Sequence, residues 1–371
     1  MRRSNKRGFN LIAGQDFAGD CDEGRQRLRN REIHVANMFP PSREHHSRFG
    51  GGTLIAVAIV IMVLCLGGCA LPGNEVDLYV DAAVLNEQGK SQKAVEKLNT
   101  AVQVNKRFSP AYSLLGVIYQ QMNDYQKSAA SYEDATKLNP WSFQDFFGLG
   151  RVYQIMKQFA KAVKAYARAC ELKPDHLEAH IGAAKCYYEI EDYNNALLYG
   201  QRAEQINPDA GELRKLLGDI YQSQKDYSQA INSYKRALEV DSNNPEIMTS
   251  LAVAYLRNNV NYNEPARELL TSVIQIQPDN GPAHQYLGYC YLLLKDVDKS
   301  IDSYERAVEM NGEDWEAHRG LGVAYAMKAT GNGGDPTLRT KAVEHWRRAL
   351  EIKPDQPRRE KLLKLIETYS K

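Results

Sequence analysis

The sequence predicts an all-α chain, built as a solenoid of about eight helix-turn-helix repeats and closed by a C-terminal capping helix. Three observations support this fold class. A residue pattern recurs with a period of about 34 over most of the chain, glycine, alanine and tyrosine return at the same places in each unit, and proline follows many of the second helices. One helical hairpin cannot bury both its apolar faces, so successive units must stack into a continuous core.

The clearest unit is 143–176. Gly150 and Ala169 lack bulk, so two antiparallel helices can approach closely, and Tyr166 fills the space beside them. The residues that recur at fixed spacing are Gly150, Tyr153, Ala162, Tyr166, Ala169 and Pro174. These residues and spacings resemble the tetratricopeptide-repeat (TPR) family. The resemblance implies a right-handed superhelical solenoid in which the first helix of each repeat lines a concave face.

The phase of the pattern divides the chain after its N-terminal region into repeats that differ in regularity. The predicted repeats are 75–108, 109–142, 143–176, 177–210, 211–244, 245–280, 281–314 and 315–356, followed by a capping helix over 357–371. The fourth has Gly200 where its neighbours have a large residue, which predicts a small void or a bend. The eighth carries extra residues from Thr330 to Asp335, which we interpret as an inserted loop, with Asp335 and Pro336 starting the next helix.

The N-terminal region has the pattern of an export signal. Residues 1–37 lack hydrophobic periodicity and are predicted to be disordered or to precede the true start at Met38; a genuine cytoplasmic extension is the alternative. Residues 38–68 contain arginines, then the apolar run Leu54 to Leu66, then small residues, as in a signal peptide. The run is shorter than the ~20 residues that a membrane-spanning helix needs, although a spanning anchor is the competing interpretation.

The apolar run ends in Leu66-Gly67-Gly68-Cys69, which resembles the lipobox of bacterial lipoproteins. The resemblance implies cleavage before Cys69 and lipidation of this cysteine, leaving 69–74 as a short lipidated tether. Ala70 follows the cysteine, which in bacteria with two membranes is the pattern of delivery to the outer membrane. We therefore expect a lipid-anchored protein of the bacterial cell envelope that is attached to the outer membrane and faces the periplasm, with the inner membrane as the alternative.

Composition and motifs argue against catalysis. The repeats account for nearly every residue after Glu75, so no separate catalytic domain is expected, and neither a cofactor nor a small-molecule substrate is implied. The formal net charge is +1, with no basic excess in the repeats, so nucleic acid is not an expected partner. The glycines near Gly333 follow a predicted helix and lack the lysine of a phosphate-binding loop.

Two histidines and three cysteines of the repeats are candidate site residues. His176 and His180 have the i, i+4 spacing of metal ligands, but His180 occupies a packing position of the repeat, so no metal is predicted. Cys170, Cys186 and Cys290 lie at apolar helix positions and are expected to be buried free thiols. A disulfide between Cys170 and Cys186 is the lesser alternative in an oxidising compartment.

The remaining functional signal is the surface of the first helices. In repeats two to five, the residues expected on the concave face are polar and mixed in charge, whereas those of repeats six to eight are more apolar. Exposed apolar side chains on successive helices would join into one patch, which usually marks an interaction site. The predicted partner-binding residues are Val253, Leu256, Tyr289, Leu292 and Val323.

These observations predict a non-enzymatic protein-protein interaction scaffold. Because lipidated relatives act in envelope assembly, the resemblance implies a role in supporting a pilus, secretin or similar complex. The expected partner is a periplasmic or envelope protein or peptide. The chain itself is expected to attach to the membrane through its lipid. The alternative function is an inner-membrane-anchored adaptor or regulator of a cell-wall enzyme.

Overall fold

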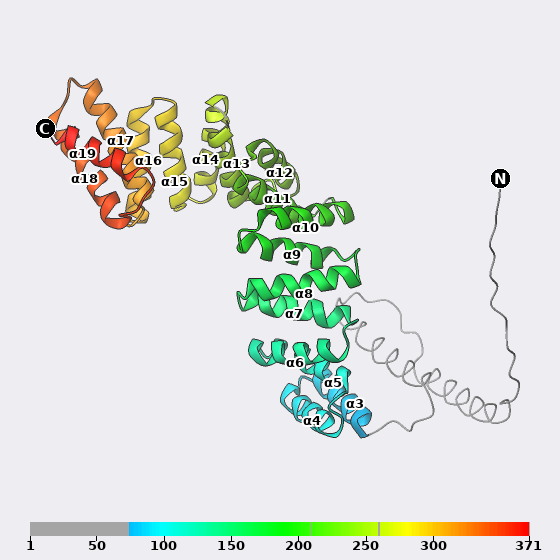
Figure 1. The fold of residues 1–371 in the computed structure, drawn as a ribbon. Helices are drawn as coiled ribbons and strands as arrows, with labels where there is room; N and C mark the ends of the chain where they lie inside the picture. The colour runs from blue at the N-terminus through cyan, green and yellow to red at the C-terminus, as the bar shows by residue number, and fades with distance from the viewer. Residues whose placement is uncertain (1–73, 209, 259, 371) are drawn as a thin grey trace, which may run out of the picture. The chain divides into compact units, whose positions relative to one another are not determined.

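In the computed structural model, the described part of the chain is entirely helical. It comprises residues 74–208, 210–258 and 260–370, which belong to one compact unit, Ala70–Lys371. Within these residues there are seventeen α-helices, one short 3-10 helix and no strand, which confirms the predicted all-α solenoid of helical hairpins (Figure 1).

The helices form eight hairpins in chain order and one final helix. Their bounds are α3 (Asn74–Glu87) and α4 (Ser91–Val104), α5 (Ser109–Gln121) and α6 (Tyr125–Leu138), α7 (Phe143–Ile155) and α8 (Phe159–Leu172), α9 (Leu177–Glu189) and α10 (Tyr193–Ile206), α11 (Gly211–Ser223) and α12 (Tyr227–Val240), α13 (Pro245–Asn258) and α14 (Asn263–Ile276) with η1 (Val260–Tyr262) between them, α15 (Gly281–Leu293) and α16 (Val297–Met310), α17 (Trp315–Gly331) and α18 (Pro336–Ile352), and α19 (Arg359–Tyr369). Each helix packs on the next one, and each first helix also contacts the first helix of the following hairpin.

An aromatic ring held between two small residues joins each regular hairpin to its neighbour. A Cβ atom added to Gly150 would lie 2.8 Å from the Tyr166 ring, and one added to Gly182, in the next hairpin, would lie 2.6 Å from it. Tyr304 is enclosed in the same way by Gly288 and Gly320. The small residue within the hairpin was predicted, but the glycine contributed by the following hairpin was not. Both are needed because the ring lies flat between the two first helices.

In the fourth hairpin, the space beside Gly200 is filled by leucine side chains from the following helix, α11. A Cβ atom on Gly200 would lie 2.8 Å from Cδ2 of Leu217, and the Leu217 side chain is buried. Leu216 stands where Gly182 stands one hairpin earlier, and it packs on Ala184. The predicted void is therefore wrong, because leucines from α11 occupy the space that a tyrosine occupies elsewhere.

The extra residues of the last hairpin lengthen its helices. Helices α17 and α18 have 17 residues each, whereas α15 and α16 have 13 and 14. The predicted inserted loop is thus largely wrong, since only residues 332–335 separate the two helices. The predicted helix start is confirmed: the Asp335 side chain accepts hydrogen bonds from the backbone N–H groups of Thr337 and Leu338, and Pro336 is the first helical residue.

The predictions for 1–37, for the signal peptide over 38–68 and for Cys69 lie outside the described residues. Only the last residue of the predicted tether 69–74 is described, and it begins α3. Among the described residues, no helix combines the length and the apolar character needed to cross a membrane.

Candidate partner-binding groove

The five residues predicted to bind a partner line one groove on the face made by the first helices. Val253 and Leu256 come from α13, Tyr289 and Leu292 from α15, and Val323 from α17. The groove has a volume of about 590 Å³. The residues meet because α13 contacts α15 and α15 contacts α17, so equivalent positions of successive hairpins lie side by side. We call this site the tyrosine groove.

The five residues differ in how accessible they are. Tyr289 is 42% exposed, and its ring stands at the surface of the groove. Leu256, Leu292 and Val323 are half-buried. Val253 is only 6% exposed, which corrects the prediction that it faces solvent: it forms part of the floor under the other side chains. An occupant would therefore contact chiefly Tyr289 and the two leucines.

Three further tyrosines line the groove. Tyr286 comes from α15, and Tyr227 lies at the start of α12. Tyr304 reaches the groove from the second helix α16, because Gly288 and Gly320 leave room for its ring to pass between the first helices. Burial raises the pKa of Tyr304 far above its ordinary value, and burial is also the main cause of the raised pKa of Tyr286. These hydroxyl groups are therefore hydrogen-bond donors at neutral pH.

Tyr304 belongs both to the core and to the groove wall, because its ring is buried and also lines the groove. The signal that identifies such a residue is a pair of glycines, one at the eighth position of its own repeat and one at the sixth position of the next. Here these are Gly288 and Gly320.

Charged groups surround the apolar centre of the tyrosine groove. Arg257, Arg319 and Arg358 line it together with a single acidic residue, Glu316. The Gln285 side-chain amide donates a hydrogen bond to Glu316 Oε2 at 3.1 Å. The Arg319 guanidinium lies 5.1 Å from the centre of the Trp315 ring, an arrangement that orients its planar group beside the groove. Arg319 occupies one of the positions expected on the concave face, whereas Arg257 and Arg358 lie outside those positions, and none of the three was among the predicted partner-binding residues.

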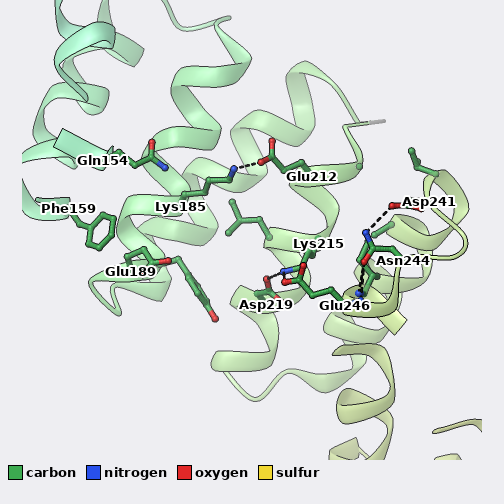
Figure 2. A pocket seen from close by; sticks show the side chains of 16 residues that line it. Gln154, Phe159, Lys185, Glu189, Glu212, Lys215, Asp219, Asp241, Asn244 and Glu246 are labelled. Atoms are coloured by element: carbon green, nitrogen blue, oxygen red, sulfur yellow. Dashed lines mark hydrogen bonds and ion pairs between the residues drawn. The ribbon is translucent and has the colours of Figure 1, made fainter. Parts of the chain in front are cut away.

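A second groove lies on the same face, between α7 and α13, and has a volume of about 720 Å³. Figure 2 shows its lysines directed at carboxylates. Lys215 Nζ lies 2.9 Å from Asp219 Oδ2 and 3.0 Å from Glu246 Oε1, and Lys185 pairs with Glu212. We call this site the paired-charge groove. It corresponds to the surface predicted to be polar and mixed in charge, and its lysines already have partners within the chain.

The histidines singled out in the sequence have structural roles. The His176 Nδ1 atom accepts a hydrogen bond from the backbone N–H of Ala179 at 3.2 Å, so His176 caps α9. His180 Nε2 lies 3.0 Å from the carbonyl oxygen of Pro174. Within the described residues, no group of three potential ligands is arranged to hold a metal ion.

The three cysteines of the described region are buried free thiols, as predicted, and the alternative of a bond between Cys170 and Cys186 is contradicted. Burial raises the pKa of both Cys170 and Cys186 to about 12. The Cys290 thiol, whose pKa burial raises to about 11, donates a hydrogen bond to the Asn263 carbonyl oxygen at 3.0 Å. Because the thiolate is the reactive form, these groups are poorly suited to nucleophilic chemistry.

Comparison with known protein families identifies the repeats. Residues 205–318 match the family model described as the cytochrome c-type biogenesis protein H TPR domain, and residues 147–211 and 109–140 match two further tetratricopeptide-repeat models. The chain therefore contains tetratricopeptide repeats, as its spacings predicted. No curated protein is significantly similar to the chain.

A solved structure with a TM-score above 0.5 supports the fold of this chain. The C-terminal part of a TPR repeat-containing protein from Cytophaga hutchinsonii is 18% identical with a TM-score of 0.53, and the match covers 66% of this chain and 99% of that one. Pseudomonas aeruginosa PilF is 18% identical with a TM-score of 0.47, over 56% of this chain and 94% of that one. YrrB, described as a TPR protein with an unusual peptide-binding site, is 19% identical with a TM-score of 0.43, over 56% and 98%.

Proposed function

We propose that this tetratricopeptide-repeat chain is a non-enzymatic scaffold of the bacterial cell envelope that binds a segment of a partner protein in the tyrosine groove. Lipid on Cys69 would hold it at the outer membrane, facing the periplasm, where it supports assembly of a larger complex. Proteins with these repeats are generally interaction scaffolds. The likeness of residues 205–318 to a biogenesis protein favours a role in assembly.

The observation that carries the proposal is the exposure of Tyr289 above an apolar floor. Its ring is 42% exposed, and Leu292 and Val323 line the same groove. Tyrosine offers a rigid apolar area with a hydrogen-bonding tip, which is why it is enriched among residues that dominate binding energy. An occupant that covers this ring removes apolar surface from water at a site already walled by neighbouring helices.

The test compares partner capture by two double variants of the full-length chain from detergent-solubilised envelopes. Tyr289→Ala with Leu292→Ser alters the tyrosine groove, whereas Arg151→Ala with Gln154→Ala alters the face formed by α7. We expect the first variant to lose the proteins that the unchanged chain captures and the second to retain them, with both variants as helical as the unchanged chain. Retention by the first and loss by the second would place the binding site at the opposite end of the array.

A further inference from the structure

We propose that the occupant of the tyrosine groove is an acidic segment, in which aspartate or glutamate side chains flank an apolar residue. Arg257, Arg319 and Arg358 would bind the carboxylates while Tyr289 receives the apolar residue. This inference rests on the proposed function and adds the chemistry of the ligand.

The three arginines have no carboxylate partner among the described residues. Arg257 forms a hydrogen bond with Tyr286, and Arg319 donates to the carbonyl oxygen of Pro357 at 3.5 Å. Arg358 makes no side-chain bond to the helix that it precedes. The acidic residue that lines the groove, Glu316, is bonded to Gln285. The groove thus presents three guanidinium groups against one carboxylate, that of Glu316, and none of the three forms an ion pair within the described residues.

The paired-charge groove provides a contrast within the same face. There, Lys215 already has two carboxylates within 3.0 Å, and Lys185 has one. An acidic segment entering that groove would have to displace these ion pairs, so little free energy would be gained. In the tyrosine groove no such pair has to be broken, and the guanidinium group offers several donors in a plane that matches a carboxylate.

Arg358 gives a separate indication. Its backbone has φ +63°, in the left-handed region that favours glycine. Other non-glycine residues with positive φ, among them Lys295 at φ +64°, lie in the turns between the two helices of a hairpin. Arg358 instead lies between α18 and α19 and directs a cation to the groove. Because non-glycine residues adopt this φ in several hairpin turns, the angle itself does not require a ligand; what distinguishes Arg358 is that its side chain lines the groove.

The test measures binding of two fluorescein-labelled peptides to the full-length chain in mild detergent. One peptide consists of aspartate and glutamate around a central phenylalanine, and the other replaces each acid by asparagine or glutamine. We expect the acidic peptide to bind about tenfold more tightly or better at low salt, because charge-assisted hydrogen bonds are stronger than neutral ones. The preference should shrink as sodium chloride rises from 50 to 500 mM, since the charges are partly exposed and screened.

Two variants test whether the arginines of the tyrosine groove cause the preference for the acidic peptide. Arg358→Gly removes the guanidinium while keeping a residue suited to positive φ, and should reduce the acidic preference by about threefold or more. Arg319→Gln should act in the same direction. Lys295→Gly is the matched control, because it makes the same kind of backbone change at φ +64° outside the groove and should leave both affinities unchanged.

The outcomes separate this inference from the proposed function. Equal affinity for the two peptides, with both lost in the Tyr289→Ala, Leu292→Ser variant, would overturn the acidic ligand and leave the groove as the binding site. Binding of neither peptide, or an acidic preference unaffected by Arg358→Gly and Arg319→Gln, would also overturn it. Loss of partner capture is measured independently and bears on the proposed function alone.

Discussion

The Nδ1 atoms of His318 and His345 lie 2.9 Å apart, in a contact that joins α17 to α18. The other ring nitrogen of His318 lies 3.2 Å from the Gly312 carbonyl oxygen, so it must carry a proton to donate there. In the neutral pair, His318 Nδ1 is then the acceptor, and His345 Nδ1–H is the donor. The contact requires that one of the two facing Nδ1 atoms carry no proton, so it opposes a further proton on His345 when His318 is charged.

This pair predicts a stability that falls in mild acid. Burial first, then His318 and nearby Lys341, lower the pKa of His345 to about 4, against the opposing effect of Glu305. Between about pH 6.5 and 4 the unfolded chain binds a proton that the folded chain excludes, so folding is weakened as the pH falls. Allowing for the partial exposure of His345, we expect a loss on the order of 1–2 kcal/mol.

Urea unfolding at pH 7.5, 6.0 and 4.5 checks this prediction. His345→Asn keeps a donor near the Nδ1 position but cannot titrate, so its stability should change less over this range than that of the unchanged chain. An equal pH dependence in the two proteins would assign the acid sensitivity to other groups.

Gly320→Ala should destabilise the chain because the added Cβ would lie 2.3 Å from Cζ of Tyr304. The ring is enclosed on its other side by Gly288, so relief requires the helices to move. We expect a loss of about 1–3 kcal/mol in the free energy of unfolding. Gly331→Ala, in the same helix but with no atom within 4 Å, is the matched control in a thermal melt. Equal melting temperatures for the two variants would show that the ring can adjust.

Lys215→Met should lower stability without affecting partner capture. The methionine keeps the apolar stem but removes the charge that lies between Asp219 and Glu246. We expect a cost of about 1 kcal/mol, because the pair is partly shielded from water. Lys137→Met, at a surface pair with Asp134 whose lysine is 69% exposed, should cost less in the same urea titration. Loss of the captured partner in Lys215→Met would instead give the paired-charge groove a role in binding.

Cys69→Ala tests the proposed anchor. If Cys69 is lipidated, the unchanged chain incorporates a radioactive fatty acid and starts at this residue, whereas the variant remains an unprocessed precursor without label. Separation of inner and outer membranes then locates the labelled protein. A variant that matures to the same size, or still incorporates label, would contradict the proposal.

The fold was accessible from the sequence because each repeat restates the same packing requirement. Gly150 and Tyr166 imply a close helical hairpin wherever their spacing recurs. Contacts between hairpins were harder to derive, since they join different repeat positions: Gly182 encloses Tyr166, and Leu217 replaces a missing ring near Gly200. A periodic pattern assigns positions but does not state which positions of adjacent repeats meet.

The candidate site was predictable to a similar degree. Equivalent places on successive first helices lie side by side, so Leu256, Tyr289 and Val323 were brought together as expected. Arg257 and Arg358 were not, because Arg358 reaches the groove from the segment after the last hairpin and Arg257 lies one position beyond the residues expected on the concave face. Their involvement depends on side-chain reach and on an unusual backbone angle, and neither follows from periodicity.

The neighbour-only contacts between hairpins also bear on how the chain acquires its structure. Among the described helices, those with substantial mutual contact are at most two helices apart in the chain. No described helix depends for its main contacts on a segment far away in the sequence. The entropy lost in closing long loops is therefore small, and folding should be fast. A chain of this design can gain structure hairpin by hairpin as it emerges, whether from a ribosome or from an export channel.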